Sequence, residues 1–317
     1  MSVSSYLASP HATAFSFEVL PPLRGKGIEG VFATIDRLMA FNPAYINITT
    51  HRNEVIYHED ADGLYRKASV RARPGTVAIA AAIRWRYGVP AVPHLICSGF
   101  TAREIENELI DLSFLGITDL LLLRGDRAKG ENRFVPTPGG LAHADELCRQ
   151  VGRFNAGQLV DEAAARPPEH PFSFGVAGYP EKHDEAMNLA ADLAFVKEKV
   201  EAGASYIVTQ MCYDNRKYFA FVENLRAMGV TVPVIPGLKP LTTLNQRTML
   251  PHTFHIDFPE ELSAELARCR SNDEVKAVGV EWAVQQAREL KEAGVPSIHF
   301  YSMNAASSIE SIAREVF

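Results

Sequence analysis

The stretch Asp119–Asp126, DLLLLRGD, changes character abruptly along its length. Four consecutive leucines are typical of a strand that is buried on both faces. Arg124 and Asp126 then place two opposite charges just beyond its carboxyl end. Such strands lie in the middle of α/β proteins, whose chemistry occurs at the carboxyl ends of the strands. We therefore expect Arg124 and Asp126 to belong to a functional site, although two charges that merely end a strand would leave the same pattern.

Length and composition are those of an ordinary soluble globular protein. The chain has 317 residues, of which 47% are hydrophobic and 22% charged, and its net charge is −6. This charge gives no electrostatic footprint for nucleic acid or for an acidic membrane. The first fifteen residues show no basic region followed by an apolar core, so we expect no secretion signal, and no apolar run approaches the roughly 18 residues needed to span a bilayer. We expect a cytoplasmic protein that binds neither nucleic acid nor a membrane.

Cysteine and histidine spacing does not indicate a metal site. The four cysteines are widely separated and form no CxxC pair, so we expect buried thiols in place of a disulfide framework or a zinc site. His252 and His255 are the tightest histidine pair, and neither a cysteine nor an acidic cluster lies near them in the sequence. We predict that the protein holds no metal.

A short apolar strand, a loop and an amphipathic helix recur along the chain. The pattern predicts eight strands, at Phe15–Leu20, Tyr45–Thr50, Val92–Ser98, Leu120–Leu123, Phe172–Tyr179, Tyr206–Tyr213, Val232–Pro236 and Ile298–Asn304. The helices predicted after them include Val31–Phe41, Thr76–Tyr87, Thr101–Leu115, His143–Phe154, Glu185–Ala202, Asn215–Met228 and Ala305–Val316. Eight such units without a Ser/Pro-rich linker favour a single domain over residues 1–317, folded as an α/β protein with one (β/α)8 TIM-type barrel.

Three segments interrupt this repeat. Residues 51–73 and 127–140 are predicted to be long loops, which in a compact domain are usually functional or mobile. About sixty residues separate the seventh and eighth strands and are predicted to add helices before the last strand. They include Glu260–Cys269 and Asp273–Ala293, which we expect to decorate the barrel wall.

The segment Gly25–Gly30, GKGIEG, matches the G-x-G-x-x-G pattern of dinucleotide-binding Rossmann folds. That pattern requires a tight turn directly after the strand, whereas Pro21 and Pro22 intervene here. The second strand also ends in Thr49 and Thr50 instead of an acidic residue that would bind a ribose. We therefore interpret these glycines as an ordinary loop.

Glu18 is the strongest candidate for acid–base chemistry. It lies between Phe17 and Val19 in FSFEVLPP, and a carboxyl group among apolar neighbours is expected to have a raised pKa. A raised pKa suits a general acid near neutral pH. The alternative is a glutamate that faces outward on the lower half of its strand.

Polar residues also lie in or just after most of the other predicted strands. They are His94, Arg124 and Asp126, Tyr179 with Glu181 and His183, Thr209 with Gln210, and Tyr301 to Asn304. A single histidine in an apolar strand, such as His94, is more often a satisfied core residue than a functional group. Asp192 and Lys199 are seven residues apart and therefore lie on one helix face, which periodicity alone would assign to solvent.

Seven ordered blocks of sequence resemble the methylenetetrahydrofolate reductase family, called MetF in bacteria. The blocks are FSFEVLPP, YINITT, PHLICSGFTAREIENELIDLSFLGITDLLLLRGD, GVAGYPEKHDEA, ADLAFVKEKVEAGASYIVTQMCYD, VIPGLKPLTTLNQ and HFYSMN. The resemblance runs from about residue 14 to the carboxyl terminus and is weakest in the two long loops and before the fifth strand. It implies a (β/α)8 barrel that binds FAD at the carboxyl ends of its strands without a Rossmann domain.

The resemblance also implies roles for individual residues. Glu18 matches the general acid, Asp126 the aspartate that contacts the pterin and tunes the flavin, and Arg124 the arginine near the pyrimidine edge of the flavin. The other positions that match the FAD site are Thr49, His94, Gly125, His143, Tyr179, His183, Asp192 and Lys199, of which Lys199 suits the pyrophosphate. The remaining positions that match the folate site are Gln210, Gln246 and Met303.

The chain departs from the family pattern at three positions. His143 stands where the family often has a tyrosine against the flavin. Thr50 and Ala305 replace a tyrosine and an arginine that are expected after the second and eighth strands. The missing arginine puts one folate contact, toward the glutamate tail, in doubt and leaves the redox centre intact.

The implied activity is the reduction of 5,10-methylenetetrahydrofolate to 5-methyltetrahydrofolate by NADH or NADPH, in a ping-pong scheme that supplies methionine synthesis. The same resemblance leads us to expect a homo-oligomer. Two alternatives from other classes remain. One is a flavin-free pterin-binding methyltransferase barrel, which the His183, Asp192 and Lys199 set disfavours. The other is a silent subunit that needs a partner, which the presence of Glu18, Arg124, Asp126 and Gln210 disfavours.

Overall fold

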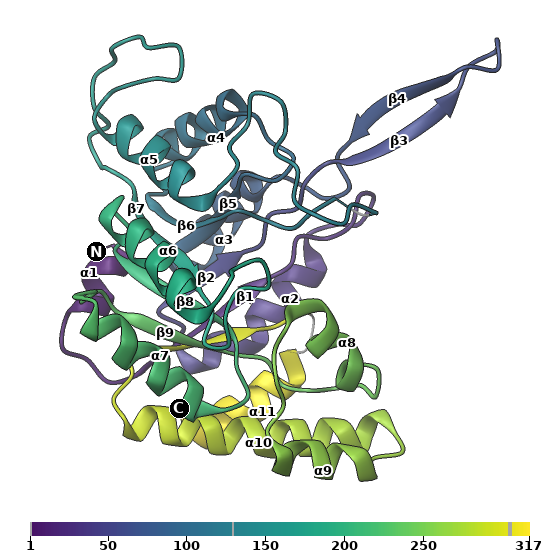
Figure 1. Cartoon of the computed structure of the whole chain (residues 1–317), viewed down its shortest axis with the longest axis vertical. Helices are drawn as coiled ribbons and strands as arrows, with labels where there is room; N and C mark the ends of the chain where they lie inside the picture. Colours follow the sequence, from purple (N-terminus) through teal and green to yellow (C-terminus); the bar gives the residue numbers. More distant parts are fainter. Residues whose placement is uncertain (1, 129, 304–305) are drawn as a thin grey trace.

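Eight parallel strands form a closed barrel in the computed structural model, which describes residues 2–128, 130–303 and 306–317 (Figure 1). The order around the barrel is β1-β10-β9-β8-β7-β6-β5-β2, and β2 pairs with β1 to close it. The (β/α)8 prediction is confirmed. The strands are β1 Ala14–Val19, β2 Tyr45–Ile48, β5 Ala91–Ile96, β6 Asp119–Leu123, β7 Ser173–Gly178, β8 Tyr206–Met211, β9 Val234–Leu238 and β10 Ser297–Tyr301.

Helices cover the outside of the barrel, close to their predicted positions. They are α2 Glu29–Leu38 with the short η1 Met39–Phe41, α3 Thr76–Tyr87, α4 Ala102–Phe114, α5 Ala144–Asn155, α6 Leu189–Glu201, α7 Asn215–Ala227, α10 Asn272–Glu292 and α11 Ala306–Val316. Helix α6 begins four residues later than predicted because the side chain of Asn188 caps it, accepting a hydrogen bond from the Ala191 backbone N–H. Asn304 and Ala305, where the last strand and helix were expected to meet, lie outside the described residues.

Side chains alternate between two apolar layers along the strands. On β1, Phe15, Phe17 and Val19 belong to the large cluster between barrel and helices. Tyr45, Val92, Leu121, Tyr206 and Ile235 instead form a cluster inside the barrel. This alternation places Ser16 and Glu18 on the inner side of β1.

A short helix that was not predicted, α1 Val3–Ala8, packs against the amino-terminal end of the barrel interior. Val3 and Leu7 join the inner apolar cluster, and the Val3 backbone N–H donates a 2.8 Å hydrogen bond to Asp119 Oδ1 at the start of β6. Burial raises the pKa of Asp119 to about 6. The amino-terminal end of the barrel is therefore closed by apolar packing.

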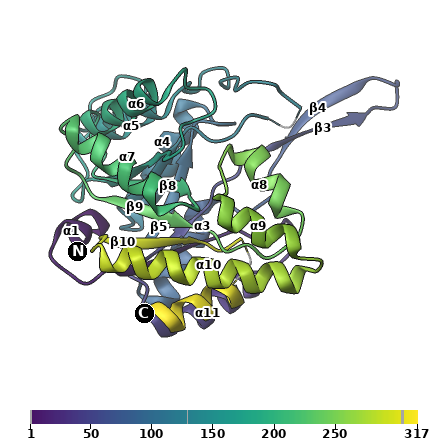
Figure 2. The same cartoon turned by 60° about the horizontal axis from the view of Figure 1, so that its bottom comes forward.

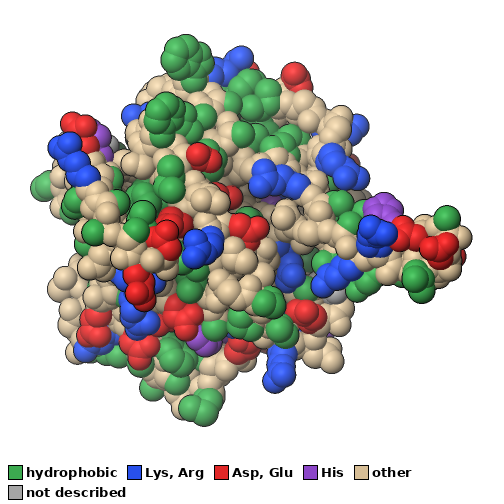
Figure 3. Space-filling view, turned by 90° about the horizontal axis from the view of Figure 1, so that it is seen from above, with side chains coloured by type: hydrophobic (Ala, Val, Ile, Leu, Met, Phe, Trp, Pro, Cys, Tyr) green, Lys and Arg blue, Asp and Glu red, His purple; other side chains and the backbone are tan. Residues whose placement is uncertain are grey.

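Part of the predicted loop 51–73 is an antiparallel hairpin, so that prediction is wrong over the two strands β3 Glu54–Glu59 and β4 Tyr65–Val70. The ribbon projects away from the barrel (Figure 1) and carries basic, acidic and apolar side chains on its surface (Figure 3). Tyr57 and Tyr65 are 64% and 68% exposed. The strands make their backbone hydrogen bonds to each other, which lets so polar a sequence adopt strand geometry away from the core.

The segment before the last strand contains α8 Gln246–Phe254, α9 Glu260–Arg268 and α10 (Figure 2). Helix α8 was not predicted. These helices share an apolar cluster with Met211 and Tyr213 of the β8 end, and Tyr301 of β10 packs against it. They therefore cover the carboxyl ends of these strands, in addition to lining the wall as expected. None of the helices in the described part of the chain is both long and apolar enough to cross a membrane.

Candidate functional site

Glu18 lies on the inner side of β1, near the carboxyl end of the strand. It is 7% exposed, and its backbone neighbours on the flanking strands are Asn47 of β2 and Tyr301 of β10. Burial raises the pKa of its carboxyl group to about 8, and the positive charge of Lys239 opposes part of that rise. The alternative of an outward-facing Glu18 is wrong. Its carboxyl group therefore holds a proton at neutral pH, which is the state that a general acid needs.

Lys239, just after β9, is a candidate that sequence reasoning missed. It is 4% exposed, and burial lowers the pKa of its ammonium group while the charge of Glu18 opposes the change. It forms no ion pair within 4.0 Å with a carboxylate of the described residues. Tyr301 lies in the adjacent strand: its ring crosses Gly237, where a Cβ atom would come 2.5 Å from ring carbon Cε2. The Tyr301 hydroxyl donates a 2.5 Å hydrogen bond to the Thr209 carbonyl oxygen of β8.

Three other polar side chains of the barrel strands are buried without complete hydrogen bonding. Nε2 of His94, Nε2 of His299 and both polar side-chain atoms of Asn47 have no partner among the described residues. Burial lowers the pKa of both imidazoles to about 3, so they are neutral. The interpretation of His94 as a satisfied core histidine is therefore wrong. Because buried polar groups are usually paired, these atoms indicate an interior able to bind polar groups of a ligand.

Arg124, just after β6, makes two contacts on the other side of the barrel mouth. Its guanidinium group forms an ion pair with Glu185, in the loop after β7. Its guanidinium carbon also lies 4.7 Å from the centre of the Phe134 ring, in the long loop after β6. The Arg124 charge is therefore shared between two loops that follow neighbouring strands.

Gly125 and Asp126 complete the turn after β6. Gly125 has φ +81°, and a Cβ atom there would come 2.9 Å from the Cβ atom of Ser98, so glycine is required. The Ser98 hydroxyl donates a 2.6 Å hydrogen bond to the Asp126 carbonyl oxygen. The Asp126 side chain is exposed. Its backbone is therefore anchored to the end of β5, while its carboxylate is accessible to solvent.

Four of the predicted residues after β7 and on α6 lie close together. The Tyr179 and His183 rings meet edge to face, with centroids 4.7 Å apart. The His183 backbone N–H donates a 3.0 Å hydrogen bond to Asp192 Oδ2, and Asp192 is 4% exposed. Lys199 Nζ donates a 2.6 Å hydrogen bond to the Ala177 carbonyl oxygen of β7. The assignment of this helix face to solvent is wrong, because both charged side chains point toward the barrel.

The remaining predicted residues are dispersed, and the described residues show no direct bond from them to Glu18 or Arg124. Thr49 is half-buried after β2, and His143 is an exposed residue at the start of α5. Gln210 Oε1 accepts a hydrogen bond from the Met211 N–H, and Gln246 Oε1 accepts one from the Thr242 N–H. Met303 is 45% exposed and has φ +34°.

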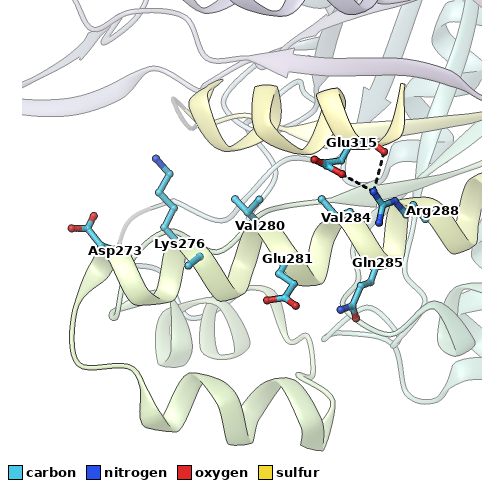
Figure 4. Close-up of a pocket in the computed structure, with 9 residues that line it drawn as sticks. Asp273, Lys276, Val280, Glu281, Val284, Gln285, Arg288 and Glu315 are labelled. Atoms are coloured by element: carbon cyan, nitrogen blue, oxygen red, sulfur yellow. Dashed lines mark hydrogen bonds and ion pairs between the residues drawn. The ribbon is translucent and has the colours of Figure 1, made fainter.

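Two surface hollows of about 550 Å³ each lie outside the barrel mouth. One is a groove between α10 and α11, crossed by the ion pair of Arg288 with Glu315 (Figure 4). The other lies between α7 and the α8–α9 segment. Neither includes a predicted site residue in its lining. The part of the chain that the structure describes brings together no group of three His, Cys, Asp or Glu side chains able to hold a metal ion.

The family model described as methylenetetrahydrofolate reductase matches residues 5–316, nearly the whole chain. The chain belongs to the methylenetetrahydrofolate reductase family. The resemblance stated from the seven sequence blocks is therefore confirmed, and the family's barrel agrees with the fold described above.

Individual relatives are similar over nearly the whole chain. Methylenetetrahydrofolate reductase (NADH) 1 of Arabidopsis thaliana is 32% identical over 306 residues, which cover 93% of this chain and 47% of the relative. The chain thus spans about half the length of this plant reductase. The 5,10-methylenetetrahydrofolate reductase of Salmonella typhimurium is 29% identical over 292 residues, covering 92% of this chain and 86% of the relative.

One solved structure shares the fold over its full length. It is an uncharacterized protein from Clostridium thermocellum, described as binding two copies of 5-methyl-5,6,7,8-tetrahydrofolic acid. Its TM-score is 0.58 at 12% identity, and the match covers 99% of this chain and 98% of that one. At this identity the likeness concerns the fold alone.

Proposed function

We propose that this chain reduces 5,10-methylenetetrahydrofolate to 5-methyltetrahydrofolate with NADH or NADPH, through FAD bound at the carboxyl ends of the barrel strands. Residues 1–317 would form the single domain that binds both FAD and folate. Family membership supports the activity. The observation that carries the proposal is the buried Glu18 carboxyl group, which keeps its proton to about pH 8 at the end of the barrel where this fold places its active sites.

Glu18 would act as the acid that opens the imidazolidine ring of the folate. The O–H bond of the carboxyl group breaks and an N–H bond forms on a ring nitrogen, which also receives the electrons of the broken C–N bond. The remaining nitrogen and the one-carbon unit then form an iminium, whose carbon accepts hydride. A general acid of this kind contributes about 10²–10⁴-fold to a rate.

The side of the mouth formed by β5, β6 and β7 fits a flavin. When bound, FAD would supply hydride transfer between NAD(P)H and the folate in two successive half-reactions. The buried Nε2 atom of His94 has no partner among the described residues and could meet a polar atom of the flavin. Arg124 has N–H groups beyond those that its pair with Glu185 needs, and its charge would stabilise a reduced, anionic ring.

Lys199 and its neighbours would hold the rest of the cofactor. Lys199 Nζ carries three N–H groups, and the Ala177 carbonyl oxygen accepts only one of them, which leaves two for the pyrophosphate. Asp192 would fix the loop through its bond to the His183 N–H. The other residues that we propose in contact with FAD are Thr49, Gly125, Asp126, His143 and Tyr179.

The folate would be bound from the opposite side and from the exposed rim. Asp126 offers an accessible carboxylate that can accept hydrogen bonds from the amino group and ring N–H of the pterin. The side-chain oxygens of Gln210 and Gln246 already accept backbone hydrogen bonds, so their NH2 groups remain available to donate. Met303, exposed after β10, would supply an apolar contact.

The test is an absorbance spectrum of the purified protein, followed by anaerobic titration. The proposal predicts a flavin spectrum that bleaches with NADH or NADPH and returns when methylenetetrahydrofolate is added. A colourless protein that transfers the methyl group of a folate would instead identify a pterin-binding methyltransferase. A flavoprotein that turns over neither substrate until another protein is added would identify a silent subunit.

A further inference from the structure

Glu18, Tyr301 and Lys239 form a row across three adjacent strands. Glu18 of β1 is in register with Tyr301 of β10. On the other side of β10, Phe300 is in register with Leu238, so Tyr301 and Lys239 are the next residues on their strands. Ile235 of β9 belongs to the inner apolar cluster, and Lys239 has the same parity, so it continues the inner side of the strand. The row therefore places an acid and a cation on the inner side of two strands that flank β10.

Burial of the Lys239 ammonium group in this position costs free energy. An ammonium group loses hydration when it is buried, and proteins usually compensate with a carboxylate in direct contact. No described carboxylate lies within 4.0 Å of Lys239. At longer range, the charge of Lys239 acts to lower the pKa of Glu18, and the charge of Glu18 acts to raise the pKa of Lys239. A buried charge that is not used for structural pairing, in the inner layer of a barrel mouth, is characteristic of a functional group.

The other titratable groups around Glu18 carry no charge near neutral pH. Burial raises the pKa of Tyr301 on β10 well above its usual value, so the phenol stays protonated. Burial keeps the imidazoles of His94 on β5 and His299 on β10 neutral, with pKa values of about 3. Asn47 on β2 does not titrate. Among the described residues, Lys239 is thus the cation whose charge acts on the Glu18 carboxyl group.

We propose that Lys239 is a positioning residue that acts through Glu18: its ammonium group stabilises the carboxylate that remains once Glu18 has given its proton to the folate. This inference rests on the proposed reduction of methylenetetrahydrofolate. Before the transfer, Lys239 faces a neutral acid, and afterwards it faces an anion. The attraction therefore grows as the proton leaves, which is the condition for a contact to accelerate the step.

Replacing Lys239 by methionine keeps the length of the side chain and removes its charge. The Glu18 acid then becomes weaker, so the folate half-reaction should slow by about 10-fold, the change that corresponds to one pKa unit. The alkaline limb of the pH–rate profile of this half-reaction, where the rate falls as Glu18 loses its proton, should move to higher pH. Lys239→Arg retains a positive charge and should restore most of the rate and the original limb.

The experiment is stopped-flow measurement of both half-reactions of the flavin-loaded protein between pH 6 and pH 10, for wild type, Lys239→Met and Lys239→Arg. Lys276→Met is a matched control, because Lys276 lines the outer groove on α10 (Figure 4) and its ammonium group bonds to Ser307 and to no other described residue. Thermal unfolding tests that each variant is folded. If Lys239→Met does not fold, Lys239→Gln replaces it, since the amide keeps a polar head in the same place.

The inference is supported if only the folate half-reaction slows and its alkaline limb moves. It is overturned if that limb stays in place, if both half-reactions slow equally, or if only the affinity for folate falls, which would mean a direct substrate contact. A wild-type protein that cannot reduce methylenetetrahydrofolate at all would overturn the proposed function itself. Wild-type turnover with a Lys239→Met variant indistinguishable from it would overturn the role of Lys239 alone.

Discussion

The two sides of the barrel mouth treat their charges differently. On the β6 and β7 side, Arg124 pairs with Glu185, Asp192 accepts a hydrogen bond from the His183 N–H, and Lys199 is bonded to a carbonyl oxygen. On the β1 and β9 side, Glu18 and Lys239 are more than nine-tenths buried and lack a direct ion-pair partner among the described residues.

This difference suits the two sides to different tasks: the first side to binding a ligand, and the second side to its chemical conversion. Charges that are already paired or bonded have fixed positions and can share their remaining donors with a bound anion. A buried acid without a direct ion pair keeps its proton until a reaction removes it. We therefore expect substitutions on the first side to change binding, and substitutions on the second side to change proton transfer and its pH dependence.

The largest expected effect is that of Glu18→Gln on the folate half-reaction. The amide keeps the shape of the carboxyl group but cannot supply a proton, so the rate should fall by at least about 10²-fold. Reduction of the flavin by NAD(P)H should survive. Single-turnover measurements of the two half-reactions provide the comparison.

Glu108→Gln is the matched control for that experiment. Glu108 lies on α4, on the outer wall, and burial raises the pKa of its carboxyl group to about 7, so it too is an abnormal acid. Its replacement should leave both half-reactions unchanged. Equal losses of both half-reactions in Glu18→Gln would show that Glu18 is structural and would remove the contrast between the two sides.

Glu18→Gln should also change how the free energy of unfolding depends on pH. The folded protein holds the Glu18 proton to about pH 8, whereas an unfolded carboxyl group releases it near its ordinary value of 4.5. Between these values the folded state binds more protons, so the free energy of unfolding decreases as pH rises. Glu18→Gln removes this loss and should be more stable than wild type at pH 9, by about 1–3 kcal/mol. Urea unfolding at pH 5, 7 and 9 measures it, and curves that stay parallel across the series would contradict a buried, protonated Glu18.

Most of the barrel could be predicted because its strands are short, largely apolar runs that alternate with amphipathic helices. Leu120–Leu123 has no polar side, which leaves few structures other than an internal strand. The β3–β4 hairpin was missed for the opposite reason: both its faces are largely polar, and it packs on no core that would impose an apolar pattern. Its Asp62-Gly63 turn was a readable signal. Helix α8 was missed because it includes Pro251, which argues against a helix in the sequence.

The residues of the candidate site also differ in how far the sequence could predict them. Glu18 was predictable from its own apolar neighbours, which are local in the sequence. Lys239 was not, because it follows a strand in an ordinary Leu-Lys-Pro context and comes near Glu18 only because β10 joins β9 to β1 in the closed barrel. The pair of Arg124 with Glu185 joins residues 61 positions apart and depends on the pairing of β6 with β7. Resemblance to a family supplied roles for many residues, and the structure added the contacts that constrain those roles.

On the binding side, Lys199→Met should weaken retention of FAD. The substitution removes two N–H groups proposed for the pyrophosphate, and a lost charge-assisted hydrogen bond of about 1.5 kcal/mol corresponds to a roughly 10-fold higher Kd. Lys197→Met is the control on the same helix, since within the described part of the chain Lys197 makes only a 3.7 Å surface pair with Glu201. Fluorescence of FAD released on dilution gives the Kd. A lower Tm with an unchanged Kd would mean that Lys199 only holds the Ala177 carbonyl oxygen and binds no cofactor.

The smallest expected effect belongs to Asp126, which is on the binding side but is exposed. Asp126→Asn keeps the hydrogen bond from Ser98 to the backbone and one side-chain acceptor, and it removes one negative charge. Interactions of an exposed charge are worth about 1 kcal/mol or less, so folate affinity should fall no more than about 5-fold. The flavin midpoint potential should rise, because a nearby anion makes a flavin harder to reduce, and reduction by NAD(P)H should continue. Asp60→Asn, on the projecting hairpin, repeats the charge change at a residue whose ion-pair partner among the described residues is Arg66 alone, and it should alter neither quantity. A potentiometric titration and a folate-binding measurement on the same variant test both expectations. A lowered potential, or a folate affinity equal to that of wild type, would mean that Asp126 merely ends the strand. Arg124 alone would then account for the role of the DLLLLRGD stretch.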